Sequence, residues 1–124
     1  MNPLCPEIYR QRLVIEGFYT VEMTEESIKL FMVELSALLG MHIVYGPIVM
    51  QEAEKLNPKH AGFEAQLVWA ESGVNLYTWK TYGFLTLDIY SCKQFDEKLT
   101  VRFVKNYFKI DTGGYVCDFP MVPM

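Results

Sequence analysis

Apolar residues recur along the chain with two different periods, and the first period predicts a helix between Thr24 and Gly40. There the apolar side chains return every three or four positions, which is the spacing of one helical face. Thr24 is a good N-cap, and the two acidic residues that follow favour the positive end of a helix dipole. Gly40 supplies a C-terminal stop. The apolar positions of this stripe are Ile28, Phe31, Met32, Leu35, Leu38 and Leu39.

A second helix is expected after Asp96, which has the side chain of a good N-cap. The apolar residues that follow again have helical spacing. They are Leu99, Phe103, Val104, Tyr107 and Phe108.

Elsewhere the pattern is typical of β-strands, with β-branched and aromatic residues in short runs. Strands are expected at residues 13–19, 42–50, 63–70, 74–80, 84–92 and 115–117. Turns are expected at Ser72-Gly73, at 81–83 and at 112–114. Links this short require antiparallel neighbours.

Strands outnumber helices, so the expected fold class is α+β: a two-layer α/β sandwich with a mostly antiparallel sheet and two helices on one face. The other face is then either wet or covered by a second subunit, and aromatic-rich strands favour a homodimer. The apolar, proline-broken tail 119–124 is expected to pack on this domain or on a partner.

Composition narrows the class of protein further. The 124 residues fit one domain, 1–124, and 51% of them are hydrophobic, which is typical of a globular chain. The net charge is −4, so phosphate-dominated binding of nucleic acid is not expected. No apolar run reaches membrane length, and the start has no signal-peptide pattern. Three cysteines and two histidines, widely spaced, indicate neither a disulfide framework nor a metal site, and a cytoplasmic protein is expected.

Glu71-Ser72-Gly73 is a segment whose residues can carry out an unusual reaction. A serine at a tight turn can attack the carbonyl of its own upstream peptide bond and convert the amide to an ester. Elimination and hydrolysis then cut the chain and leave a pyruvoyl group, a ketone that can act as a covalent electron sink for an amine substrate. The spacing alone favours an ordinary hairpin turn.

A wider motif surrounds this segment. Residues 70–84 read Ala-Glu-Ser-Gly-Val-Asn-Leu-Tyr-Thr-Trp-Lys-Thr-Tyr-Gly-Phe, and Asp88 and Ser91-Cys92 follow. This run resembles the core of the prokaryotic S-adenosylmethionine decarboxylases. That family has Glu-Ser-His, three residues, His-Thr-Trp-Pro-Glu-Tyr-Gly-Tyr, and then a strand that contains Asp and ends in Thr-Cys. The match is ungapped from about residue 62 to residue 92, and the resemblance covers about residues 12–108.

The resemblance implies a self-cleaving proenzyme that dimerises, with the cut between Glu71 and Ser72. The fragments would be 1–71 and 72–124, the second capped by a pyruvoyl group derived from Ser72, with no metal and no pyridoxal phosphate. Cys92 would donate the proton that replaces carbon dioxide on a small-molecule amine substrate, and the product would feed spermidine synthesis. A thiol is mostly protonated at neutral pH, which suits this role. For a lone cysteine, a small buried apolar residue is the alternative interpretation.

The chain also departs from the family motif. Tyr77 stands where the family has a histidine that assists processing, and tyrosine is a poor base at neutral pH. Glu64 stands where the family has a second processing residue, a serine. Thr81 replaces the glutamate that holds the substrate ribose. The substrate-binding residues expected on this chain are Glu64, Asn75, Trp79 and Thr81.

Three hypotheses remain open. The first is a divergent pyruvoyl-dependent decarboxylase of S-adenosylmethionine. The second keeps the pyruvoyl chemistry but acts on a basic amino acid such as arginine or ornithine, with Glu64 pairing with the distal cation. The third is a non-catalytic, uncleaved dimer that binds a small molecule or a catalytic paralogue, which the tyrosine at position 77 favours.

Overall fold

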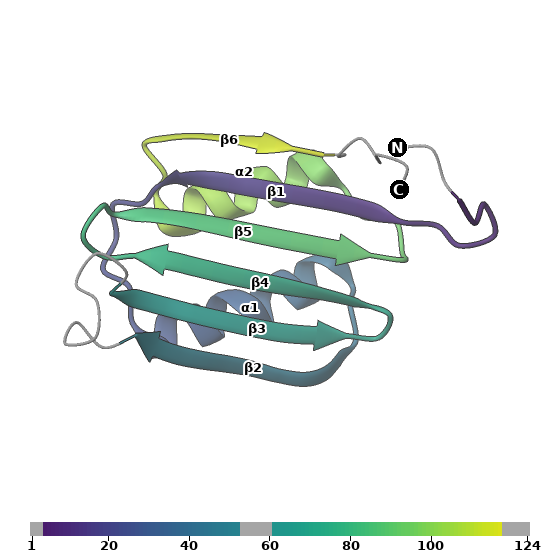
Figure 1. Ribbon diagram of the computed structural model, residues 1–124, viewed down its shortest axis with the longest axis horizontal. Helices are drawn as coiled ribbons and strands as arrows, with labels where there is room; N and C mark the ends of the chain where they lie inside the picture. The colour runs from purple at the N-terminus through teal and green to yellow at the C-terminus, as the bar shows by residue number, and fades with distance from the viewer. Residues whose placement is uncertain (1–3, 53–60, 118–124) are drawn as a thin grey trace.

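The computed structural model of the chain describes residues 4–52 and 61–117, and the tail 119–124 lies outside this range. Within it the chain forms six strands and two helices (Figure 1). In order they are β1 (Gln11–Phe18), α1 (Glu25–Leu39), β2 (Ile43–Glu52), β3 (Gly62–Trp69), β4 (Ser72–Trp79), β5 (Phe84–Ser91), α2 (Glu97–Phe108) and β6 (Thr112–Val116).

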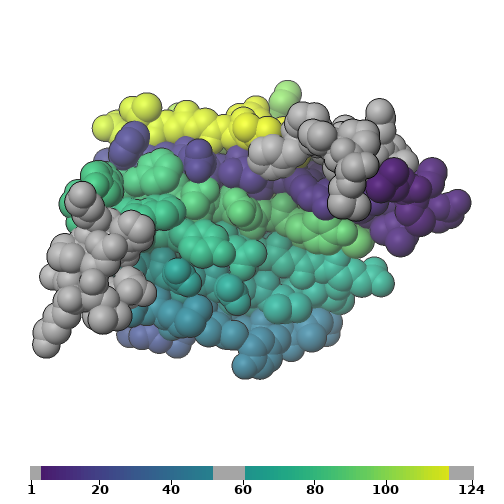
Figure 2. Space-filling view, viewed as in Figure 1, coloured from purple at the N-terminus to yellow at the C-terminus, as the bar shows by residue number. Residues whose placement is uncertain are grey.

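The strands form one sheet in the order β2-β3-β4-β5-β1-β6, and every neighbouring pair is antiparallel. Both helices lie behind the sheet in Figure 1, and Figure 2 shows the opposite face, which they leave uncovered. The expected fold class is therefore confirmed. We call the uncovered side, which carries Arg12, Asn75, Tyr77 and Asp88, the open face.

The core lies between the sheet and the helices and follows from the two apolar periods. Along β5, Leu85, Leu87 and Ile89 alternate inward and are at most 2% exposed. From the helices, Phe31 of α1 meets Phe108 of α2 with 4.6 Å between ring centroids. Burial of these large apolar side chains on a single face is the main stabilising contribution to the two-layer arrangement.

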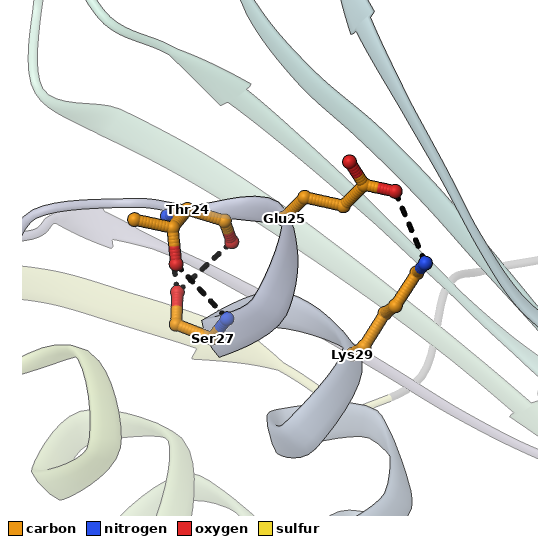
Figure 3. Close-up of polar contacts among 4 residues, drawn as sticks. All are labelled: Thr24, Glu25, Ser27 and Lys29. Atoms are coloured by element: carbon orange, nitrogen blue, oxygen red, sulfur yellow. Dashed lines mark hydrogen bonds and ion pairs between the residues drawn. The ribbon is translucent and has the colours of Figure 1, made fainter.

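The start of α1 is fixed by a reciprocal pair of hydrogen bonds (Figure 3). The Ser27 backbone N–H donates to Thr24 Oγ1 at 3.0 Å, and the Thr24 backbone N–H donates to Ser27 Oγ at 3.0 Å. Two otherwise unpaired donors are thus satisfied. Lys29 and Glu25 form an exposed ion pair at 3.0 Å one turn further on.

Thr24→Ala should lower the free energy of unfolding by about 1 kcal/mol, because the cap bond to the helix is lost. Lys29→Ala is the matched control on the same turn, and loss of its exposed ion pair should cost no more than about 0.5 kcal/mol. Urea unfolding followed by circular dichroism measures both values. Equal losses for the two variants would contradict the importance given to the cap.

Two turns predicted from the sequence are wrong. Ser72 and Gly73 belong to β4, because Ser72 pairs with Trp69 and the reversal is made by Ala70 and Glu71. Residues 112–114 belong to β6, which pairs with β1. There Gly113 lies opposite Gly17, and a Cβ on Gly113 would stand 2.6 Å from the Glu16 carbonyl oxygen. Gly113 therefore permits a close approach of two strands rather than a turn.

Candidate active site

Ser72 is the first residue of β4, directly after a two-residue turn. Glu71, the second residue of that turn, has φ of 59°, in the left-handed region. For a residue with a side chain this conformation costs on the order of 1 kcal/mol. The strain therefore falls on the residue whose carbonyl a self-processing serine would attack.

The hydroxyl of Ser72 is held by a residue of the adjacent strand. Ser72 and Ser91 are opposite each other in the β4–β5 register, and Ser72 Oγ donates to Ser91 Oγ at 3.1 Å. Ser91 is fully buried; its hydroxyl accepts from the Lys93 N–H at 2.9 Å and donates to the Lys93 carbonyl at 2.6 Å. This contact was not predicted from the sequence, where its only signal is the hydroxyl residue in the Ser-Cys end of the motif.

Cys92 follows Ser91 and is thus next to the residue that binds Ser72. Its Sγ lies 3.4 Å from Tyr90 Oη. The hydrogen bond to Cys92 is the main cause that raises the pKa of Tyr90, while the charges of Arg12 and Arg10 act to lower it. The Arg12 guanidinium lies 4.8 Å from the centre of the Tyr90 ring. The phenol that contacts the thiol is therefore itself under the influence of two guanidinium groups.

A groove of about 540 Å³ adjoins this cluster. Its lining residues are Arg12, Val14, Ser72, Gly73, Asn75, Asp88, Ile89 and Tyr90. Asn75 and Asp88 face each other in register at its middle. Burial, followed by repulsion from Glu16, raises the pKa of Asp88. The groove thus combines the predicted cleavage residue with amide, carboxylate and guanidinium groups.

The remaining predicted site residues lie towards the other end of the sheet. Glu64 and Tyr77 are opposite each other on β3 and β4. Tyr77 is five positions beyond Ser72, about 17 Å along an extended strand. Trp79 packs on Phe84 with 5.6 Å between ring centroids, and Thr81 is exposed in the turn that follows β4.

The structure thus divides the predicted residues into two groups. Ser72 and Asn75 line one groove, Glu71 directly precedes Ser72, and Cys92 directly follows Ser91, the residue opposite Ser72. The structure places Glu64, Tyr77, Trp79 and Thr81 apart from them. Among the described residues, no group of three or more His, Cys, Asp or Glu side chains could hold a metal ion, and no helix is long and apolar enough to cross a membrane.

The fold and motif place the chain in a class of two-layer α+β proteins with an antiparallel sheet and helices on one side. The family model described as S-adenosylmethionine decarboxylase matches residues 16–115, and the chain belongs to this family. Members of the family are in general pyruvoyl-dependent, act on a small-molecule substrate and oligomerise.

The fold is also that of a solved structure, the adenosylmethionine decarboxylase from Aquifex aeolicus VF5. The TM-score is 0.71, and the similarity covers 94% of this chain and 94% of that one. The sequence identity is 12%, so this likeness concerns the fold alone. No curated protein matches the chain.

Proposed function

We propose that the chain cleaves itself between Glu71 and Ser72 and then acts as a pyruvoyl-dependent decarboxylase of S-adenosylmethionine. The observation that carries this proposal is the position of Ser72. It follows a strained turn residue, its hydroxyl is held by Ser91, and it lines a groove beside the Tyr90–Cys92 pair. Nucleophile, attacked carbonyl and proton donor thus belong to one small region of the sheet.

The cleavage can be written for these residues. Ser72 Oγ attacks the Glu71 carbonyl carbon, the C–N bond breaks, and an ester replaces the amide. Removal of the Ser72 Cα proton then forms a Cα=Cβ double bond and breaks the Cβ–Oγ bond, which frees the Glu71 carboxylate. Water converts the remaining enamine to the ketone and releases ammonia. The second step needs a base, and that is the function for which Tyr77 is poorly suited.

A homodimer is part of this proposal. Tyr77 and Glu64 lie too far along the sheet to act on the Ser72 of their own chain. A second copy stacked on the open face would bring its own Tyr77 and Glu64 towards that serine. The open face also exposes apolar side chains suited to an interface: Phe18, Met50 and Val68 are each 45–48% exposed.

In the cleaved protein the ketone supplies an electron sink for the substrate amine. Cys92 then delivers its proton to the substrate carbon from which carbon dioxide has left, and Tyr90 Oη, 3.4 Å away, orients the sulfur. The proton returns to the thiol from solvent.

Cys92→Ala should therefore still cleave but release carbon dioxide about 100-fold more slowly, which is the usual contribution of a positioned proton donor. Release of labelled carbon dioxide from carboxyl-labelled S-adenosylmethionine measures this rate. Cys5→Ala is the matched control, because among the described contacts the Cys5 thiol donates only to the carboxylate of the nearby, exposed Glu7. Turnover of Cys92→Ala equal to that of the control would refute the role of Cys92.

A basic amino acid is the second candidate substrate. The observation that favours it is the carboxylate of Asp88 in the groove, with Glu16 near enough to raise its pKa. Asp88 is opposite Asn75, about 10 Å along the strand from Ser72, whereas Glu64 is about 17 Å away. Asp88 is thus better placed than Glu64 to pair with a distal cation. Carbon dioxide release from arginine and ornithine, compared with S-adenosylmethionine, separates the two substrate classes.

A non-catalytic dimer is the remaining candidate, and the observation that favours it is Tyr77 itself. With a poor base at this position, the chain would stay intact and the groove would bind a small molecule without converting it. A catalytic paralogue could then occupy the open face. The size of the purified chain distinguishes this candidate from both decarboxylases.

A further inference from the structure

Arg10 carries a buried polar atom that the proposed cleavage does not use. Its Nη2 is inaccessible to solvent and has no hydrogen-bond partner among the described residues. A charged donor that is removed from water without a partner is unfavourable. The surroundings of Arg10 therefore favour an anion that would accept a hydrogen bond from Nη2.

Arg10 directly precedes β1, next to the end of the groove where Ser72 lies, and is not itself one of the lining residues. Gln11, the next residue, is opposite Ser91 in the β1–β5 register, so Arg10 is beside Cys92. Arg10 and Arg12 alternate onto the same side of the strand and both act electrostatically on Tyr90. Arg12 and Tyr90 also line the groove together with Ser72. Both guanidinium groups therefore lie near Tyr90, whose phenol contacts the Cys92 thiol, and Arg12 shares the groove with Ser72.

We propose that Arg10 and Arg12 bind the carboxylate of the substrate that the groove receives. This rests on the proposed decarboxylase function. A guanidinium presents paired N–H donors whose geometry matches the two oxygens of a carboxylate. With the carboxylate held here, the bond between the substrate carbon and the carboxyl carbon breaks beside Cys92. Carbon dioxide leaves, the electron pair stays on the substrate carbon, and the Cys92 proton joins it.

This arrangement has a kinetic signature. The negative charge on the carboxylate disappears as carbon dioxide forms, so its attraction to the two arginines is stronger in the bound substrate than in the transition state. Loss of Arg10 should therefore raise KM without lowering kcat. A merely structural role for Arg10 would not produce this division.

The direct test compares ligands that differ only in the carboxylate. The protein is the full-length Ser72→Ala chain, which cannot turn the ligands over. The probes are S-adenosylmethionine and its decarboxylated form, and arginine and agmatine, in isothermal titration calorimetry. In this background Arg10→Gln should weaken binding of a carboxylated ligand at least tenfold and leave that of the matching amine unchanged. Arg10→Lys, which keeps the charge, should recover part of the loss.

Arg102→Gln is the matched control, because Arg102 is an exposed arginine on α2, on the side of the sheet opposite the groove. Arg102→Gln removes the same charge and should change the affinity neither for the carboxylated ligand nor for the matching amine. Equal weakening of acid and amine by Arg10→Gln, no weakening at all, or failure of the parent chain to bind any carboxylated ligand would overturn the inference. The titration does not depend on cleavage. An uncut wild-type chain that still shows the difference would refute the self-processing and retain the carboxylate site.

Discussion

Replacement of Ser72 by alanine is expected to leave the chain at full length and to remove all measurable decarboxylation. The hydroxyl is both the nucleophile that opens the Glu71–Ser72 bond and the source of the ketone, so no other group can substitute for either role. Alanine fits the strand without strain, and Ser91 Oγ keeps its bonds to the Lys93 backbone. The variant should therefore fold normally.

Electrophoresis and carbon dioxide release together check this expectation. Ser72→Cys is the informative companion, because a thiol is also a nucleophile and should restore a slower cut at the same bond. Fragments 1–71 and 72–124 from the alanine variant would show that the serine is not the processing group.

Tyr77→His should speed cleavage by about 100-fold, because it supplies a base that titrates near neutral pH. Tyr77→Phe is the control: it keeps the ring and removes the phenol, and its rate should stay close to that of the wild type. The measurement is the time course of fragment appearance after rapid purification. Cleavage of the histidine variant at the wild-type rate would contradict a processing role for this position.

A mixing experiment then tests where the histidine acts. A chain with both Ser72→Ala and Tyr77→His cannot cleave itself, but it can offer its histidine to a partner. Mixed with the wild-type chain, it should speed cleavage of the wild type, because Tyr77 and Ser72 of one chain are about 17 Å apart along the strand. No acceleration in the mixture, with acceleration in Tyr77→His alone, would place the two residues in the same chain.

Much of the fold follows from local sequence patterns. The helix from Thr24 to Gly40 has its caps where the side chains indicate them, and the alternation along β5 matches its buried face. These features depend on residues close together in the chain. They are therefore visible without knowledge of the tertiary structure.

The turn before Ser72 could not be read in this way. Ser-Gly has the composition of a turn, but the reversal is made by Ala70 and Glu71, and Glu71 adopts a positive φ that its type rarely takes. The strained residue, Glu71, therefore lies in the turn, whereas the cleavage residue, Ser72, is the first residue of the strand that follows. This was apparent only from the strand register.

The composition of the site was also only partly predictable. Ser72 begins β4 and Cys92 directly follows β5, so both come to the same end of one hairpin. Arg10 and Arg12 precede them by about 60 to 80 positions and reach the site because β1 pairs with β5. Conversely, Tyr77 is close to Ser72 in sequence but not in space. Spacing along a motif shows which residues belong together in a family, but not which of them meet within one chain.

The intact mass of the freshly purified wild-type protein tests the central claim most directly. Self-processing predicts two species, residues 1–71 with a normal C-terminal carboxylate and residues 72–124 with a pyruvoyl group in place of an amino-terminal amine. A single uncut species of 124 residues that persists for days would contradict the account. It would leave the chain as a non-catalytic member of its family.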